Sequence, residues 1–197
     1  KSIAVAGSHG KTTTTNMLAY VLQKAKQNII AVAGPTSPQV LDSFPLIYKG
    51  DQRGLRNPER VFVFEADEYQ NKLKHYSPFG AILTNVELDH PDYFKTQKSY
   101  EKVFDDFVKR IPPDGFLVYC SDDPACRTIA KFAKCKLLPY GFSEDSTYLI
   151  RAVENPTNGA PFALHNHGTP VGIFRTALLG RHNILNAAAV VLAAREL

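Results

Sequence analysis

Residues 7–13, with the sequence GSHGKTT, have the types and spacing of a loop that binds phosphate groups. Glycines let the backbone curl so that several N–H groups point at one anion, and a following helix adds the positive end of its dipole. Lys11 would supply a mobile charge for the β- and γ-phosphates, and Thr12 a hydroxyl for Mg²⁺. Val5 stands where the usual pattern has its first glycine, so a plain strand-to-helix turn is the alternative interpretation.

A run of acidic residues, EADE at 65–68, directly follows the apolar segment 61–64. A carboxylate beside a phosphate loop commonly holds Mg²⁺, directly or through water, because this ion prefers oxygen ligands. Three carboxylates in four residues favour that role over the alternative of solvated acids at the end of a strand.

The segment NVELDHPD, residues 85–92, follows another apolar run at 81–84. His90 can ligate a metal ion through a neutral ring nitrogen, while Asp89 or Asp92 orients the ring or shares the ion. A histidine beside an aspartate is more often a surface pair. Here the pair follows a predicted strand, as do the loop at residues 7–13 and the acidic run at 65–68. This shared position favours contact with a metal ion or a phosphate.

The spacing of apolar runs predicts an α/β fold. Short runs that are apolar on both faces, as in buried parallel strands, occur at residues 3–6, 29–33, 61–66, 81–86, 116–120 and 136–140. Helical patterns lie between them at residues 13–26, 99–110 and 124–132. We therefore expect an open, mostly parallel sheet flanked by helices. Ligands bind beyond the carboxyl ends of such strands, which is where all three motifs lie.

The other segments depart from this alternation. The stretch between Gly34 and Arg60 is rich in proline and glycine and indicates a long surface excursion with room for a short hairpin. A small antiparallel β subregion is predicted at about 147–177, from strand-like segments at residues 148–153, 162–165 and 171–176. A helix follows at 183–197. We expect residues 1–197 to form a single domain.

The composition is that of an ordinary globular protein, with 44% hydrophobic and 21% charged residues among 197. The net charge of +4 could suggest a polyanionic partner, but the basic residues form no run, and an anionic small molecule explains the charge equally well. No nucleic-acid partner is expected. No apolar stretch reaches the roughly 18–20 residues of a membrane span, and no leader is evident, so we expect a cytoplasmic protein. Cys120, Cys126 and Cys135 lack paired spacing and are expected to be reduced thiols.

Two other nucleotide-binding classes match poorly. A guanine-nucleotide switch could use the DxxG at residues 51–54, but the Asn-Lys pair at 71–72 lacks the aspartate that reads guanine. A dinucleotide-binding fold needs a GxGxxG after the first strand, and the chain has none there. His165 and His167 have metal-ligand spacing but lie in a predicted turn, which favours a solvated role.

Four segments, in this order, resemble the central ATPase domain of the Mur ligases, and with the stretches between them the resemblance covers essentially the whole chain. They are residues 6–14, 64–69, 84–94 and 179–187. The resemblance implies an ATP-dependent amide-bond ligase of peptidoglycan precursor synthesis that works through an acyl phosphate. ATP and Mg²⁺ are the implied cofactors, and UDP-N-acetylmuramate and L-alanine are the implied substrates. In this family, separate N-terminal and C-terminal domains bind the UDP-sugar and close over ATP, and both are expected to lie outside this chain.

The resemblance also implies roles for individual residues. Lys11 and His90 are the implied catalytic residues, and Thr12, Glu65 and His90 are the implied Mg²⁺ ligands. The implied ATP contacts are Gly7, Ser8, His9, Gly10, Lys11, Thr12, Thr13, His182, Asn183 and Asn186. Many family members carry a carbamylated lysine after the histidine motif, but no pattern selects Lys98 or Lys102 for it.

The resemblance leaves three alternatives open. These are a ligase that recycles murein peptides, a folate-type polyglutamate ligase, and a regulatory module that binds a nucleotide without hydrolysing it. We expect the domain alone to bind Mg-ATP weakly and not to ligate, because catalytic positioning needs the closing domain.

Overall fold

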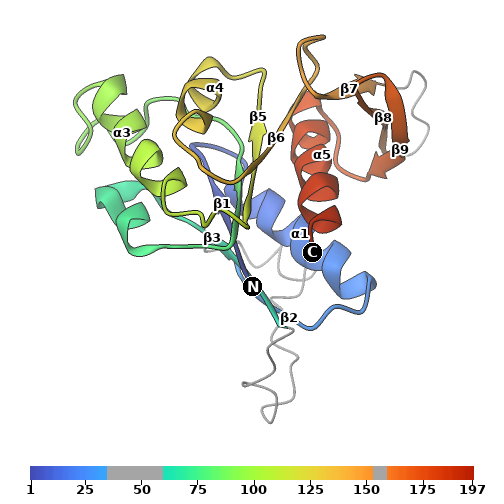
Figure 1. The fold of residues 1–197 in the computed structure, drawn as a ribbon, viewed down its shortest axis with the longest axis horizontal. Helices are drawn as coiled ribbons and strands as arrows, with labels where there is room; N and C mark the ends of the chain where they lie inside the picture. Colours follow the sequence, from blue (N-terminus) through green and yellow to red (C-terminus); the bar gives the residue numbers. More distant parts are fainter. Residues whose placement is uncertain (35–59, 153–158) are drawn as a thin grey trace.

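The structure is a computed structural model that describes residues 1–34, 60–152 and 159–197. Within these residues nine strands form one sheet with helices on both faces (Figure 1). The excursion predicted between Gly34 and Arg60, with the DxxG at 51–54, lies outside the described residues. The strands are β1 (Ser2–Ala6), β2 (Ile29–Val32), β3 (Val61–Glu65), β4 (Gly80–Leu83), β5 (Phe116–Cys120), β6 (Lys136–Gly141), β7 (Tyr148–Ala152), β8 (Ala160–Asn166) and β9 (Thr169–Thr176).

The strand order β2-β3-β1-β4-β5-β6-β7-β8-β9 puts β1 at the centre of the ligand-bearing strands. The pairs from β2 to β7 are all parallel, and β1 lies between β3 and β4. The chain therefore changes direction of travel across the sheet beside β1, which is where open α/β sheets bind ligands. The predicted mostly parallel sheet is confirmed, and its topology brings the three motif-bearing strand ends side by side.

The predicted antiparallel subregion is confirmed as β7, β8 and β9, and it continues the same sheet. Strand β7 pairs parallel with β6 through Tyr140 and Tyr148, and antiparallel with β8. Strands β8 and β9 form a hairpin whose turn contains His167 and Gly168, both with positive φ. His167 lies in the turn of this hairpin, as the sequence predicted, whereas His165 lies within strand β8 and pairs with Pro170 of β9.

Helices α1 (Lys11–Lys24) and α5 (Arg181–Arg195) contact each other and cover one face of the sheet. The 3₁₀ helix η2 (Tyr69–His75) and helices α3 (Gln97–Val108) and α4 (Pro124–Ala130) cover the other (Figure 1). Apolar side chains of β1 and β4 alternate between the two cores, since successive residues of a strand point to opposite faces. Among the described residues, no helix is long and apolar enough to cross a membrane.

Three helices begin two residues earlier than the apolar periodicity predicts, because their capping residues set the start. Helix α1 follows Gly10, whose φ of 81° turns the chain sharply, and α5 follows Gly180. Helix α3 follows Thr96, whose hydroxyl accepts from the Ser99 N–H in a reciprocal capping box. As a result, Lys11 and Thr12 lie within the first turn of α1.

Candidate functional site

The loop between β1 and α1 needs glycine at two positions. Gly7 has a φ of 132°, and a Cβ atom there would collide with the Thr84 hydroxyl. Gly10 has a φ of 81°, and a Cβ atom there would lie 2.9 Å from Oδ1 of Asn186. Each glycine therefore meets both a backbone requirement and a steric one. The loop is shaped by packing against the end of β4 and the start of α5.

Side chains that follow β4 fix the backbone conformation of this loop through hydrogen bonds. Asn85 accepts a hydrogen bond from the His9 N–H at 2.9 Å and donates one to the His9 carbonyl at 2.9 Å. The Thr84 hydroxyl donates to the same carbonyl at 2.7 Å. Ser8 N donates to the Asn85 carbonyl at 3.0 Å. The loop is thus preorganised by neighbouring groups, as an anion-binding loop requires.

Lys11 folds back over the loop. Its ammonium donates to the carbonyls of Gly7 at 2.6 Å and Ser8 at 3.1 Å. It also donates to Oε1 of Glu68 at 3.2 Å. An anion seated in the loop would lie beside this ammonium, so Lys11 has the position that phosphate binding demands.

Thr12 and Glu65 lie together at the junction of α1 and β3. The Thr12 hydroxyl donates to Oε2 of Glu65 at 2.8 Å, and the Gly34 N–H donates to the same oxygen at 2.7 Å. A hydroxyl and a carboxylate oxygen side by side, next to a phosphate loop, are the donor set that Mg²⁺ takes. These two residues fit the ion. Thr13 follows in the first turn of α1 and is half-buried.

A second group of possible metal ligands follows β3 and β4. Glu68, Asp89 and His90 each offer one ligand atom, and these atoms all lie within 4.8 Å of one another. Nε2 of His90 lies 3.4 Å from Oε1 of Glu68 and 3.8 Å from Oδ2 of Asp89. Two carboxylates and an imidazole in this arrangement fit a divalent cation. The sequence pointed to His90 and Asp89, but it did not separate Glu68 from its acidic neighbours.

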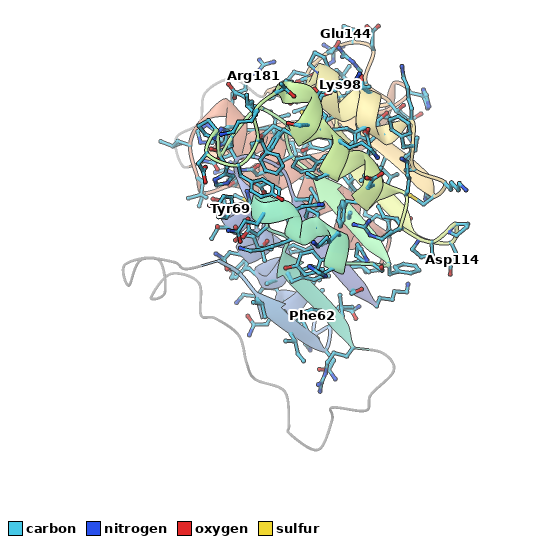
Figure 2. The ribbon with its side chains drawn as sticks, turned by 90° about the vertical axis from the view of Figure 1, so that its left-hand side faces the viewer. Phe62, Tyr69, Lys98, Asp114, Glu144 and Arg181 are labelled. Atoms are coloured by element: carbon cyan, nitrogen blue, oxygen red, sulfur yellow. The ribbon has the colours of Figure 1, made fainter. Side chains whose placement is uncertain are left out.

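The position of His90 is set by its backbone and by an aromatic neighbour. Its φ of 55° lies in the left-handed region, where residues other than glycine are uncommon. The centre of the Tyr69 ring, labelled in Figure 2, lies 4.7 Å from the centre of the imidazole ring. The Tyr69 hydroxyl donates to Asp92 at 2.8 Å, and this bond raises the pKa of Tyr69 and lowers that of Asp92. Asp92 thus anchors the tyrosine that packs against the imidazole ring of His90.

Tyr100 of α3 links the loop to the buried acid. Its hydroxyl lies 2.9 Å from the Ser8 hydroxyl and 3.3 Å from Oε1 of Glu68. Burial strongly raises the pKa of Tyr100, so the hydroxyl remains a neutral donor. No sequence signal pointed to this role, because a buried tyrosine on an amphipathic helix is normally a core residue.

The two lysines considered for carbamylation, Lys98 and Lys102, are exposed on the same helix, α3. Lys98 is labelled in Figure 2. Lys102 forms an ion pair with Asp106.

A cavity of about 480 Å³ extends from the loop to the start of α5. His182 and Asn186 lie on its wall, and their implied role as adenine contacts stays a prediction. The other lining residues are His9, Gly10, Thr84, Asn85, Cys120, Asp122, Asp123, Pro124 and Leu185. Asn183 does not line it; its amide donates to the Leu179 carbonyl at 2.7 Å and receives a bond from Asn186 at 3.4 Å. Asn183 thus contacts Asn186 by a hydrogen bond without lining the cavity itself.

Two aspartates on this wall, Asp122 and Asp123, also accept hydrogen bonds from backbone N–H groups, and the sequence assigned neither of them a role. Asp123 caps α4 through its Oδ1 and accepts from the Val86 N–H at 2.9 Å through its Oδ2. Asp122 accepts from the N–H groups of Phe142 and Ser143. The Arg181 guanidinium lies 3.8 Å from the centre of the Phe142 ring, so the start of α5 contacts the segment that Asp122 holds.

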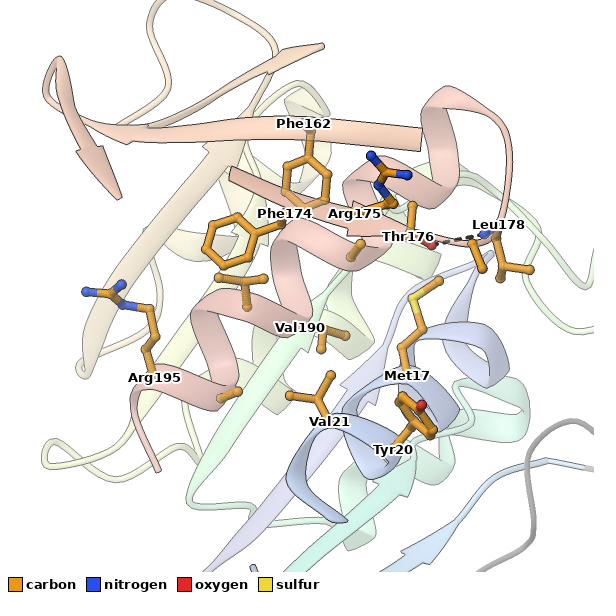
Figure 3. A pocket seen from close by; sticks show the side chains of 14 residues that line it. Met17, Tyr20, Val21, Phe162, Phe174, Arg175, Thr176, Leu178, Val190 and Arg195 are labelled. Carbon is orange, nitrogen blue, oxygen red and sulfur yellow. Dashed lines mark hydrogen bonds between the residues drawn. The ribbon is translucent and has the colours of Figure 1, made fainter. Parts of the chain in front are cut away.

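A larger cavity of about 650 Å³ lies between α1, α5 and the hairpin of β8 and β9 (Figure 3). It is lined by Met17, Tyr20, Val21, Phe162, Phe174, Arg175, Thr176, Ala177, Leu178, Ala187, Val190, Val191, Ala194 and Arg195. These residues include no carboxylate, no histidine and no part of the loop. The loop borders the smaller cavity instead, through His9 and Gly10.

Comparison with known proteins identifies the family. The family model for the Mur ligase middle domain matches residues 5–194. The chain belongs to the Mur ligase family. A UDP-N-acetylmuramate--L-alanine ligase from Streptococcus mutans is 36% identical over 190 residues, which is 96% of this chain and 38% of that protein. A ligase of the same name from Streptococcus pyogenes gives the same figures. This Mur ligase domain thus spans about 38% of the length of those curated relatives.

Solved Mur ligase structures share the fold. UDP-N-acetylmuramate:L-alanyl-gamma-D-glutamyl-meso-diaminopimelate ligase from Neisseria meningitides has a TM-score of 0.81 and 29% identity, covering 99% of this chain and 61% of that one. UDP-N-acetylmuramate-alanine ligase MurC from Thermotoga maritima has a TM-score of 0.78 and 23% identity, covering 98% and 40%. The second likeness is one of fold alone. Both agree with the mostly parallel sheet described above.

Proposed function

We propose that this chain is the ATP-binding central domain of a ligase that joins L-alanine to UDP-N-acetylmuramate in peptidoglycan precursor synthesis. The observation that carries the proposal is the convergence of the glycine loop, Lys11, the Thr12–Glu65 pair and His90 at adjacent strand ends. The L-alanine ligases among its relatives, at 36% identity, support the choice of substrates.

The reaction requires ATP to activate a carboxylate. The substrate carboxylate oxygen takes the γ-phosphoryl group and ADP leaves; the amine of the amino acid then attacks the acyl carbon, and phosphate leaves as the amide forms. Mg²⁺ would neutralise charge on the phosphate oxygens. Lys11 lies where it can do the same, and the loop N–H groups would orient the triphosphate. The transferring group needs positioning and charge rather than a covalent protein intermediate.

The test of the nucleotide site is a titration of Mg-ATP by calorimetry against the native chain and Lys11→Ala. Losing one charge-assisted hydrogen bond of about 1.5–3 kcal/mol should weaken binding about 10- to 150-fold. Lys24→Ala, at the exposed end of the same helix, is the charge-matched control and should bind like the native chain. Equal affinities for the native chain and Lys11→Ala would contradict the proposal.

A murein-peptide ligase is the second candidate, and the TM-score of 0.81 to the Neisseria ligase supports it. ADP release by the whole protein, with UDP-N-acetylmuramate present, separates the two. Release that depends on L-alanine supports the first candidate, and release that depends on a murein tripeptide supports the second. We propose that these 197 residues alone release no ADP in response to either, because catalytic positioning in this family needs the closing domain.

A further inference from the structure

Glu68 is the one acidic or basic side chain that is fully buried in the described part of the chain. It lies just after β3, at the entry to η2. A buried carboxylate is costly unless a positive charge and hydrogen bonds compensate it. The groups around Glu68 therefore indicate its role.

Glu68 connects the phosphate loop to the histidine that follows β4. Its Oε1 lies 3.2 Å from Nζ of Lys11 and 3.4 Å from Nε2 of His90. Its Oε2 is buried and lies 3.0 Å from the Lys11 ammonium, but no donor is directed at it in hydrogen-bond geometry. One carboxylate oxygen is thus held by charge alone and has coordination capacity to spare.

Lys11 cannot serve both this carboxylate and a triphosphate equally well. Its ammonium now contacts Glu68 and two loop carbonyls, and a bound triphosphate would compete for it. As Lys11 turns toward phosphate, Glu68 loses part of the charge that compensates its burial. A divalent cation between Glu68, Asp89 and His90 would restore that charge, since their ligand atoms already lie within 4.8 Å of one another.

We infer that Glu68 is an exchange ligand, which holds Lys11 before the nucleotide binds and a divalent cation afterwards. Nucleotide and cation then bind cooperatively, because each makes the exchange easier for the other. This inference rests on the proposed nucleotide site and adds the coupling. Tyr100 is the positioning residue, since its neutral hydroxyl bridges Ser8 of the loop and Oε1 of Glu68.

The experiment counts Mn²⁺ ions bound per chain by electron paramagnetic resonance, with and without a non-hydrolysable ATP analogue. The native chain should bind a second Mn²⁺ at least tenfold more tightly when the analogue is present. Glu68→Gln should bind the analogue with one Mn²⁺ and lose this second, coupled ion. Tyr100→Phe should keep two ions but weaken the coupled one several-fold.

Asp67→Asn is the matched control, because this acid precedes Glu68 directly but pairs with Lys72 on the surface. It should keep both ions. If Glu68→Gln does not fold, as judged by circular dichroism, Glu68→Asp carries the test, since it retracts the same charge by one methylene. A second Mn²⁺ bound with native affinity and coupling in the folded variant would overturn the inference alone. A native chain that binds no analogue would overturn the proposed function and the inference with it.

Discussion

Replacing Gly7 with alanine tests whether the loop geometry depends on a missing side chain. Gly7 has a φ of 132°, which side chains rarely tolerate, and its added Cβ would collide with the Thr84 hydroxyl and lie 2.9 Å from the Asn85 carbonyl oxygen. Thr84 and Asn85 cannot simply withdraw, because both hold the His9 backbone. The alanine must therefore either strain the loop or displace the end of β4.

Two contributions set the magnitude. Backbone strain of this kind costs about 1–3 kcal/mol, and overpacking at a rigid contact costs about a further 1–3 kcal/mol. Gly7→Ala should therefore lower the free energy of unfolding by roughly 2–6 kcal/mol. At about 2–4 °C per kcal/mol for a chain of this size, the melting temperature should fall by several degrees at least.

The control is Gly168→Ala in the turn between β8 and β9. Gly168 also has a positive φ, of 81°, but an added Cβ would meet nothing within 4 Å. The reduced entropy of the unfolded chain is common to both changes, so the clash at Gly7 should appear as an extra loss of about 1–3 kcal/mol. Urea unfolding followed by circular dichroism measures both. Equal losses in the two variants would refute the argument that packing against Thr84 shapes the loop.

Four further predictions follow from described contacts. Thr12→Val removes the hydroxyl beside Glu65 and should raise the Mg²⁺ concentration for half-maximal nucleotide binding about tenfold, or about 1.4 kcal/mol, in a Mg²⁺ titration. Asp123→Ala removes a helix cap, worth about 0.5–2 kcal/mol, and leaves a buried N–H unpaired at about 1–3 kcal/mol, so urea unfolding should show a loss of roughly 1.5–5 kcal/mol. Partial burial alone would raise the pKa of Asp67, but hydrogen bonds from Lys72 and a backbone N–H outweigh burial, and the pKa is lowered. The stability that this shift contributes is present above the pKa of the unfolded state and is lost as pH falls through the pKa of the folded state. Lys72→Met removes the main lowering contact and should raise the pKa of Asp67 in an NMR titration. Burial raises the pKa of Cys120 to about 11, so its thiol should react slowly with disulfide reagents at pH 8 and faster as pH rises toward that value or on unfolding.

The sequence was sufficient for the parts of the site that follow from local order along the chain. A strand, a glycine loop and a helix that begins with Lys11 and Thr12 are contiguous, and the parallel sheet then places the ends of β3 and β4 beside them. Because the carboxyl ends of parallel strands share one edge, Glu65 and His90 could be assigned to the same site before any distance was known.

Contacts that depend on the direction of a side chain could not be predicted from the order of the elements along the chain. Glu68 comes only three positions after Glu65, yet Glu65 faces Thr12 and Glu68 is buried between Lys11 and His90. The backbone conformation after β3 decides this difference, and acidic residues in a row give no clue to it. Likewise, Asn183 and Asn186 look equivalent on a helix, but only Asn186 lines the cavity.

The contact between Gly10 and Asn186 also has a consequence for biosynthesis. The loop that would hold phosphate is made near the start of the described chain, whereas the helix that packs against it comes 176 residues later. At synthesis rates of about 5–20 residues per second, roughly 9–35 s separate the two. During that interval the growing chain carries a glycine loop without the wall supplied by α5. A nucleotide bound as proposed would meet the wall that Asn186 supplies only after α5 has been made, so this part of its stabilisation of the fold would come late in folding.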